Sequence, residues 1–252
     1  CIRDRDSCHG EAGDREFPTR LTSAGEITLS DRVVKELDID ALRASFLVYT
    51  RAAFNTIPRL RRPRILEVGC GSGAATIELA RLSDGEITAV DPDGDALEEL
   101  RLRIQEFGFA SRVQVVHGSI FETGIAAGTF DIGWEEGVFH LLETDRALAE
   151  AARLVVSGGY LVMFETNLWL ESALGRFKAH GFRQHRRIPL PPGAWWSNYY
   201  GPLEERVANL KQKCTNSDDR EMLQGFEREI SQVKADVPKT DCSFLIMQRL
   251  QH

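Results

Sequence analysis

One stretch decides the fold of this chain: Arg64-Ile-Leu-Glu-Val-Gly-Cys-Gly-Ser-Gly-Ala-Ala-Thr-Ile-Glu-Leu-Ala80. Its first part, residues 64–68, is short and mostly apolar, which is typical of a strand buried on both faces of a sheet. Gly69, Gly71 and Gly73 follow at alternate positions. Glycine permits positive φ and lets backbone N–H groups approach a ligand with no Cβ in the way. A helix that begins directly after such a turn presents unpaired N–H groups and a positive dipole end, so the stretch predicts a strand, a nucleotide-type cradle and a helix.

The glycine turn by itself leaves three interpretations open. The run from Gly69 to Ala74 also fits the looser G-x-G-x-x-G/A dinucleotide fingerprint. A tight strand-to-helix turn that binds no ligand is the third. The residues further along the chain decide between them.

Composition and charge narrow the class of protein. The chain has 252 residues, 42% of them hydrophobic and 27% charged, which is ordinary for a soluble globular protein and sufficient for one large α/β domain or two small ones. The formal net charge of −7 argues against nonspecific binding to nucleic acid, and we interpret the basic run at 180–187 as a solvated strand edge. No apolar run approaches the roughly 20 residues that span a bilayer, so we expect no membrane span, and the first residues carry no signal-peptide pattern.

Cysteine usage predicts the compartment and excludes the common zinc sites. The five cysteines are scattered and contain no C-x-x-C pair: Cys1, Cys8, Cys70, Cys214 and Cys242. This pattern indicates reduced thiols in a cytoplasmic protein. Cys1, Cys8 and His9 fit no common zinc spacing, so we expect no metal.

Strand and helix patterns alternate through the first two thirds of the chain. Short apolar strands are expected at 64–68, 86–90, 112–116, 130–134 and 160–164. The segment Ser157-Gly-Gly is expected to form the turn that leads into the fifth of these strands. Helices are expected over 40–57 and from the glycine turn to about residue 82. A further helix has its apolar face formed by Leu97, Leu100, Ile104 and Phe107, and another is expected from a cap at Thr144 or Asp145 to residue 154. This alternation specifies a parallel sheet with helices on both faces. Ligands of such sheets bind beyond the carboxyl ends of the strands, where residues 69–73, 91, 118–120 and 135–137 fall.

The last third predicts a helix over 169–180, a strand over 182–188, two helices and a final strand over 242–250. A Pro/Gly break precedes the aromatic residues Trp195, Trp196, Tyr199 and Tyr200. We therefore expect a disordered tail over 1–25, an N-terminal helical segment over 26–60, a core over 61–190, a helical lid over 191–240 that selects the acceptor, and the last core strand over 241–252.

At this point the sequence resembles the class I S-adenosylmethionine-dependent methyltransferases. The run from Glu67 to Gly73 is similar to the first motif of that family, and Asp91 ends the second strand, where the family places its ribose-binding acid. Residues 153–162 resemble the turn into its fifth strand, although proline is commoner than Ser157 there. Residues 134–139 and 196–200 look closest to a small bacterial subgroup of mostly uncharacterised small-molecule methyltransferases.

The resemblance, which covers roughly residues 40–250, implies a fold. It is an α/β, Rossmann-like, seven-stranded doubly wound sheet with a reversed terminal β-hairpin and a helical insert before the last strand. It also implies S-adenosylmethionine as the cofactor. The residues implied on the methionine side are Glu67, which would orient the glycine turn, the backbone of Gly69, Cys70, Gly71 and Gly73, and Glu135 at the end of strand four.

The adenosine side is implied in the same way. Asp91 would accept the ribose hydroxyls and Pro92 would flank the adenine. Ser119 and Ile120 would meet the adenine edge. Many relatives carry Asp in place of Ser119, so the contact to the adenine amino group is expected to be weaker or water-mediated.

Methyl transfer from a sulfonium is an in-line displacement that needs a general base only when the acceptor is protonated at neutral pH. Candidates for the catalytic side are His140, Glu136 and Tyr199, and each has a purely structural alternative: a partly buried histidine, a solvated loop acid and core packing. Nucleic-acid amino methyltransferases often carry Asp/Asn-Pro-Pro-Tyr/Phe after strand four, where this chain has Trp134-Glu-Glu-Gly137. We therefore predict a small-molecule acceptor and disfavour nucleic acid. The oligomeric state cannot be read from the sequence.

Two other functions compete with this prediction. An NAD-type oxidoreductase shares the glycine turn and an acid about 20 residues further on. The short loop after strand four and the reversed terminal hairpin argue against it. A non-catalytic interaction protein that binds S-adenosylmethionine is the other alternative, and retained cofactor affinity without turnover would favour it.

Overall fold

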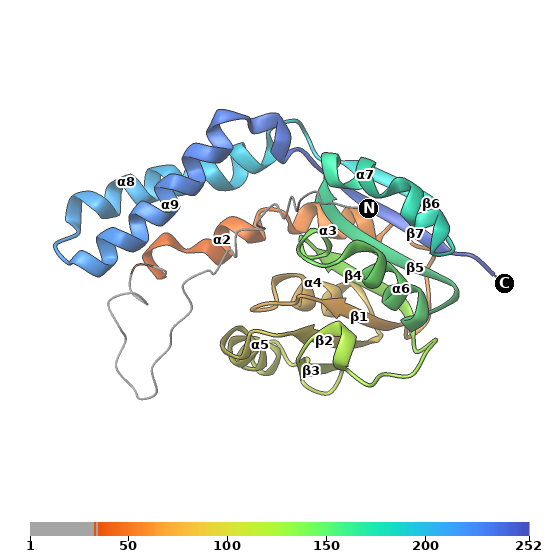
Figure 1. The fold of residues 1–252 in the computed structure, drawn as a ribbon. Coiled ribbons are helices and arrows are strands. Elements are labelled where there is room, and N and C mark those ends of the chain that lie inside the picture. The colour runs from red at the N-terminus through yellow and green to blue at the C-terminus, as the bar shows by residue number, and fades with distance from the viewer. Residues whose placement is uncertain (1–32, 34, 252) are drawn as a thin grey trace, which may run out of the picture.

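The computed structural model describes residue 33 and residues 35–251 (Figure 1). The predicted tail over 1–25 and the residues Cys1, Cys8 and His9 lie outside this range. In the described part, seven strands form one sheet in the order β3-β2-β1-β4-β5-β7-β6. Their bounds are β1 Arg64–Val68, β2 Glu86–Asp91, β3 Val113–His117, β4 Phe130–Glu136, β5 Val155–Thr166, β6 Phe182–Pro189 and β7 Cys242–Arg249.

The sheet is parallel from β3 to β5 and reverses at β7. Strands β1, β2, β3, β4 and β5 pair in parallel, whereas β7 runs antiparallel to both β5 and β6. The strand order therefore runs outward in both directions from β1, towards β3 on one side and towards β5 on the other. The carboxyl ends of the parallel strands β1, β2, β4 and β5 all lie at one edge of the sheet. The predicted fold class is confirmed, including the reversed terminal hairpin.

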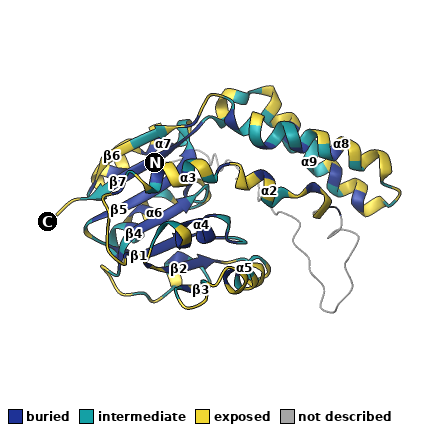
Figure 2. Ribbon diagram, turned by 180° about the vertical axis from the view of Figure 1, so that it is seen from behind, coloured by how far each residue is buried: buried dark blue, intermediate teal, exposed yellow. Residues whose placement is uncertain are grey.

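Helices cover both faces of the sheet. Figure 2 shows the central strands as a buried layer between them, with the edge strand β6 largely exposed. On one face lie α3 (Leu47–Phe54), α4 (Ala74–Leu82) and α5 (Gly94–Glu106), and on the other lie α6 (Thr144–Leu154) and α7 (Asn167–Ala179). Successive residues of β1 enter opposite cores, Ile65 the first and Leu66 the second, as expected when both faces of a strand are buried.

A pair of helices between β6 and β7 projects beyond this sandwich. A π-helical turn, Trp196–Tyr200, leads into α8 (Gly201–Lys213), and α9 (Ser217–Ala235) returns alongside it with α2 (Ile39–Ala44) as a neighbour (Figure 1). Ion pairs Lys211–Glu227 and Lys234–Glu204 join α8 to α9. The Arg206 guanidinium of α8 donates to backbone carbonyls of residues 37 and 38. The insert is thereby attached to the segment that leads into α2.

The structure corrects several local predictions about the helices. The single helix expected over 40–57 is two helices, α2 and α3, because the chain breaks at Ser45, whose hydroxyl donates to the Leu42 carbonyl over 2.6 Å. Helix α6 is capped by Glu143, whose carboxylate accepts from the backbone N–H groups of residues 145 and 146, and not by Thr144 or Asp145. Phe107, expected on the buried face of α5, caps its end and is 41% exposed.

Two strands extend further than predicted. The Ser157-Gly-Gly segment lies inside β5, and the pairing with β4 shifts register there: Phe130 pairs with Val155, but Ile132 pairs with Tyr160. Gly158 has a φ of +82°, a backbone conformation that suits glycine. Strand β4 continues to Glu136, so Glu135 and Glu136 belong to the strand and do not follow it. No helix in the described residues is long and apolar enough to cross a membrane.

Candidate functional site

The glycine turn after β1 is held by its own backbone. The N–H groups of Gly69 and Cys70 donate to the Val90 carbonyl of β2 over 2.8 and 3.3 Å, and the Gly73 N–H donates to the Cys70 carbonyl over 2.9 Å. All three glycines have positive φ: +70° at Gly69, +51° at Gly71 and +89° at Gly73. A residue with a Cβ would strain this backbone, which explains the spacing seen in the sequence.

The glycines differ in what surrounds them. A Cβ on Gly69 would lie 2.2 Å from a methyl carbon of Val138, and one on Gly73 would lie 2.2 Å from a methyl carbon of Leu100. A Cβ on Gly71 would have no described atom within 4 Å. Gly69 and Gly73 are thus required for close packing, whereas Gly71 borders open space on the side where a ligand would approach.

Asp91 connects this turn to the end of β2. One carboxylate oxygen accepts from the Gly71 N–H and the other from the Asp93 N–H, both over 2.8 Å. The residue is 9% exposed. A carboxylate has about four acceptor positions, so Asp91 retains capacity for the hydroxyls of a ribose. The carbonyl of Pro92 lies 2.9 Å from Nε2 of His117, which fixes the loop that follows β2.

Of the two residues implied at the adenine edge, Ser119 lies in a loop and Ile120 is buried in the core. The Ser119 hydroxyl accepts from the Phe121 N–H over 3.3 Å and so caps the 3₁₀ turn Ile120–Glu122. Ile120 is 3% exposed and belongs to the core beneath α6. Its side chain therefore serves packing, and a contact to adenine would have to come from its backbone.

Glu67 is the most isolated acid of the site. It is 3% exposed, and its Oε2 has no hydrogen-bond partner among the described residues. Burial, together with the nearby carboxylates of Glu136 and Asp91, raises the pKa of Glu67 to about 8, against the opposing effect of a side-chain hydrogen bond with Thr76. No hydrogen bond in the described part of the chain joins Glu67 to the glycine turn, so the orienting role implied by the resemblance is a proposal without a direct contact.

The two acids at the end of β4 face opposite sides of the sheet. Glu136 accepts from the Thr50 hydroxyl of α3 and from the Trp134 indole N–H, both over 2.9 Å, and burial raises its pKa. It is not a solvated loop acid. Glu135 is fully buried, and one oxygen accepts from the N–H groups of Val138 and Phe139 over 3.0 and 3.4 Å. Burial, followed by the charge of Glu165, raises the pKa of Glu135 well above its usual range.

Residues 138–141 bring His140 against a buried acid that sequence reasoning missed. Glu165, the residue before the end of β5, accepts from the His140 backbone N–H over 3.0 Å. Its second oxygen lies 2.8 Å from the ring Nδ1 of His140. The Glu165 side chain is 1% exposed and that of His140 is 37% exposed. With Nδ1–H donating to Glu165, the other ring nitrogen of His140 is the proton acceptor, an orientation typical of a general base.

Tyr199, the third catalytic candidate, belongs to the helical insert. It is 7% exposed, and burial raises its pKa. The charged groups that act on it are Arg43, Glu229 and Asp40, which lie on α2 and α9, and not His140. Of the four aromatic residues, Trp195 is the one that reaches β5: its ring lies 6.1 Å from that of Phe164 and is nearly parallel to it.

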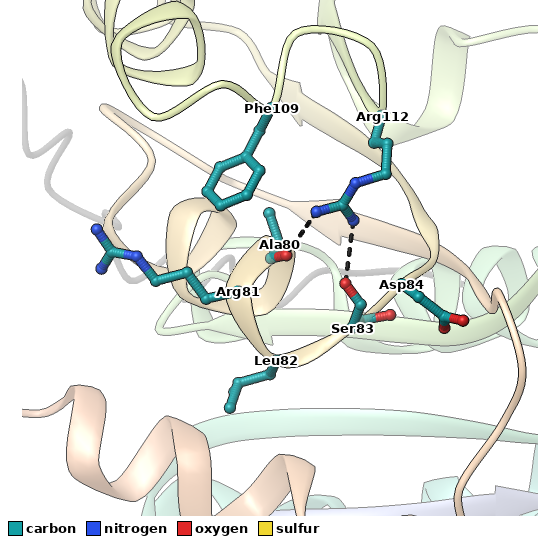
Figure 3. Close-up of a pocket in the computed structure, with 7 residues that line it drawn as sticks. All are labelled: Ala80, Arg81, Leu82, Ser83, Asp84, Phe109 and Arg112. Carbon is teal, nitrogen blue, oxygen red and sulfur yellow. Dashed lines mark hydrogen bonds between the residues drawn. The ribbon is translucent and has the colours of Figure 1, made fainter.

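A surface hollow elsewhere in the molecule is structural. It lies at the end of α4, next to the start of β3 and away from the carboxyl ends of the strands (Figure 3). The guanidinium of Arg112 donates to the backbone carbonyls of Ala80, Ser83 and Gly85 over 2.8 to 3.0 Å. Arg112 therefore caps the C-terminus of α4 and is already fully engaged there.

The family described as "Methyltransferase domain" matches residues 66–163, which run from β1 to β5 and contain the glycine turn, Asp91 and His140. This match supports the resemblance to the class I S-adenosylmethionine-dependent methyltransferases over residues 66–163. The methyltransferase GfsG of Streptomyces halstedii is 29% identical over 101 residues, which are 40% of this chain and 36% of that protein. An uncharacterised methyltransferase of Schizosaccharomyces pombe is 29% identical over 112 residues, 42% of this chain and 40% of that protein. The chain thus matches well under half the length of these two relatives.

Solved structures agree on the fold. The crystal structure of the [4+2]-cyclase SpnF superposes with a TM-score of 0.69 at 18% identity and covers 81% of both chains. Such low identity shows the fold and not the reaction. The methyltransferase domain match supports the resemblance and the cofactor, S-adenosylmethionine, that were predicted from the sequence. The subgroup of small bacterial enzymes remains a prediction.

The residues at the carboxyl ends of β1 and β2 fit this cofactor. Gly71 borders open space, Asp91 offers spare acceptor positions, and Glu67 offers an unpartnered buried oxygen at the same edge of the sheet. A cationic ligand with ribose hydroxyls satisfies these features together. A group of three or more side chains able to hold a metal ion was not found in residues 33 and 35–251.

Proposed function

We propose that this methyltransferase transfers a methyl group to a hydroxyl group of a small organic molecule, with His140 as general base. The observation that carries the proposal is the contact between His140 and Glu165 at the carboxyl end of the sheet. When bound, S-adenosylmethionine supplies an electrophilic methyl group on a sulfonium. An alcohol or phenol is a weak nucleophile while it keeps its proton, so an oriented histidine is useful for this class of acceptor.

The residues of the chain have separate tasks in this proposal. The backbone at Gly69, Cys70, Gly71 and Gly73 bounds the methionine side of the cofactor, and Asp91 accepts the ribose hydroxyls. His140 removes the acceptor proton through Nε2, while buried Glu165 holds the ring and stabilises the imidazolium that forms. Glu135 holds residues 138 and 139 and thereby places His140.

A contact of Val138 supports the proposal that His140 lies next to the cofactor. Val138, two residues before it, packs so closely on the glycine turn that Gly69 could carry no Cβ. The general base and the cofactor cradle are therefore neighbours through residues 138–140.

Printed names among the relatives support a hydroxyl acceptor. A 27-O-demethylrifamycin SV methyltransferase of Amycolatopsis mediterranei is 25% identical over 108 residues, and an O-methyltransferase of Aspergillus nomiae is 24% identical over 144 residues. A tRNA adenine-N6 methyltransferase of Shewanella is 33% identical over 88 residues and makes RNA the second acceptor class. The sequence Trp134-Glu-Glu-Gly137 argues against that class, because it lacks the Asn-Pro-Pro-Tyr type of motif.

The test is an assay with S-adenosylmethionine carrying a tritiated methyl group. The protein is incubated with a panel of phenols and alcohols, and in parallel with bulk tRNA, and the label in each fraction is counted. We expect label in the organic fraction, lost in a His140→Asn variant that still binds the cofactor. Label in tRNA alone would refute the proposal, and cofactor binding without any transfer would favour the non-catalytic alternative.

A further inference from the structure

Three acids gather where β1, β2, β4 and the glycine turn meet, and one of them differs from the other two. Asp91 accepts from two backbone N–H groups, and Glu136 accepts from a hydroxyl and an indole N–H. Each of these carboxylates has donors that stabilise a negative charge. Glu67, between them, is 97% buried; the hydroxyl of Thr76 on α4 acts on it, but no ion pair or backbone N–H in the described residues compensates a charge on its Oε2. The Cys70 thiol also faces this acid, and burial together with the charges of Glu67 and Asp91 raises its pKa.

The positive groups near these acids are engaged elsewhere. Arg51 of α3 is paired with Glu78 of α4. Arg103 of α5 donates to Asp40 of α2 and to the Ser72 carbonyl. In the described part of the chain, no cation forms an ion pair with Glu67. Burying an unpaired carboxylate charge costs free energy, and a cationic ligand that binds beside Glu67 would reduce this cost.

We propose that Glu67 is an ionisable counter-ion for the cofactor: it is protonated in the free protein and releases its proton to solvent when a cationic ligand enters the cradle. This inference rests on the proposed function. S-adenosylmethionine carries a sulfonium in addition to its amino-acid charges, whereas its product, S-adenosylhomocysteine, is a neutral thioether. Binding of the cofactor is therefore coupled to ionisation of Glu67 more strongly than binding of the product.

This coupling would lower the affinity for the product relative to that for the cofactor and so favour product release. After methyl transfer the positive charge on sulfur is gone, and the ionised Glu67 is again buried without a counter-ion. It takes a proton back from solvent, which removes the interaction that favoured the charged cofactor. The structure thus assigns Glu67 a specificity role, which is to discriminate a sulfonium from a thioether.

The experiment is calorimetric titration of the whole chain with each ligand at pH 7, in buffers of different ionisation enthalpy. The slope of the observed enthalpy against that of the buffer counts the protons released. Because the pKa of Glu67 lies near 8, S-adenosylmethionine should release about 0.9 proton at pH 7, falling to about 0.1 at pH 9. S-adenosylhomocysteine should release far less. Between pH 6 and 8 the affinity for the cofactor should rise by up to about tenfold per pH unit, and that for the product should change little.

Variants assign the proton. Glu67→Gln should bind both ligands with nearly equal affinity and release no proton beyond what the ligand itself contributes. Glu78→Gln, a matched buried acid already paired with an arginine, should keep the release. Equal proton release from Glu67→Gln and the unaltered protein, or loss of release in Glu136→Gln instead, would overturn the assignment. If Glu67→Gln does not fold, a pH-independent ratio of the two affinities in the unaltered protein overturns it as well.

The outcomes separate this inference from the function on which it rests. Failure to bind S-adenosylmethionine at any pH would refute the proposed function. Binding without proton release would leave that function standing and refute only the role of Glu67.

Discussion

Replacing the central glycine of the turn with alanine should separate ligand binding from folding. Gly71 has a φ of +51°, and a Cβ there would meet no described atom within 4 Å. The left-handed conformation costs an alanine about 1–2 kcal/mol relative to glycine, so Gly71→Ala should lose only about that much stability. The new methyl group, however, would occupy the open side of the cradle. We expect the affinity for S-adenosylmethionine to fall by about 10- to 100-fold, or roughly 1–3 kcal/mol.

Gly69→Ala is the matched comparison, because the same strain is combined with a collision. Its φ is +70°, and the added Cβ would lie 2.2 Å from a methyl carbon of Val138. Overpacking adds about 1–3 kcal/mol to the strain, so the total loss of stability should be about 3 kcal/mol. Truncation to Val138→Ala removes both methyl carbons involved, and the double variant should recover most of the overpacking loss.

Two measurements decide the outcome. Urea unfolding followed by circular dichroism gives the free energy of unfolding of each variant, and calorimetric titration gives the dissociation constant of S-adenosylmethionine. A Gly71→Ala variant that binds the cofactor as tightly as the unaltered protein would refute the position of the cradle. A Gly71→Ala variant as unstable as Gly69→Ala would refute the argument from space.

Three further predictions follow from the site and its surroundings. His140→Asn or Glu165→Gln should lower the rate of methyl transfer by about 10²- to 10⁴-fold without changing the dissociation constant of the cofactor, as measured by label transfer and calorimetry; a weakened cofactor affinity of the same size would contradict the role of base and orienting acid. The free protein should become less stable as pH rises from about 4.5 to 8, because folded Glu67 retains its proton over this window while unfolded Glu67 loses it. Urea unfolding at several pH values should show a slope that is smaller in Glu67→Gln by up to about 1.4 kcal/mol per pH unit, while Glu135 and Glu136, whose pKa values are also raised, keep their own contribution; an unchanged slope would contradict the reasoning. Arg112→Met should cost about 2 kcal/mol of stability, because three backbone carbonyls lose a donor, and should leave cofactor binding unchanged; reduced binding would connect the hollow of Figure 3 to the site.

The parts of the fold that were predictable are those in which a local pattern has one physical solution. The spacing of Gly69, Gly71 and Gly73 after an apolar strand requires positive φ at a strand-to-helix turn, and the structure has it at all three. A Ser-Gly-Gly segment such as the one at Ser157 is compatible with two structures, a turn between elements or a bulge inside a strand. The neighbouring strand decides between them: β4 pairs with residues on both sides of the segment, so the segment forms a bulge inside β5. The cap of α6 was ambiguous for a related reason: Glu143, Thr144 and Asp145 are adjacent, and each can accept from a backbone N–H group.

Sequence reasoning found His140 but not its partner, for a reason of topology. Glu165 lies 25 positions further along the chain, at the end of an apolar strand, where an acid has no special spacing. Its importance depends on the order β1-β4-β5, which places the carboxyl ends of β4 and β5 side by side. An acid before the end of the strand next to β4 is the signal that could have found it. Tyr199, within the aromatic run, is buried beside charged groups of α2 and α9, and its catalytic role stays a prediction.

The segment 138–140 joins the two halves of the site, and this explains why both depend on buried acids. Glu135 receives the N–H groups of Val138 and Phe139, and Glu165 receives the N–H and the ring of His140. Val138 rests on the glycine turn, so a shift of that turn on ligand entry would move His140 as well. The charge of Glu165 helps raise the pKa of Glu135, so the two acids interact across adjacent strands. The cofactor side and the acceptor side are thus coupled through three residues and two acids from adjacent strands.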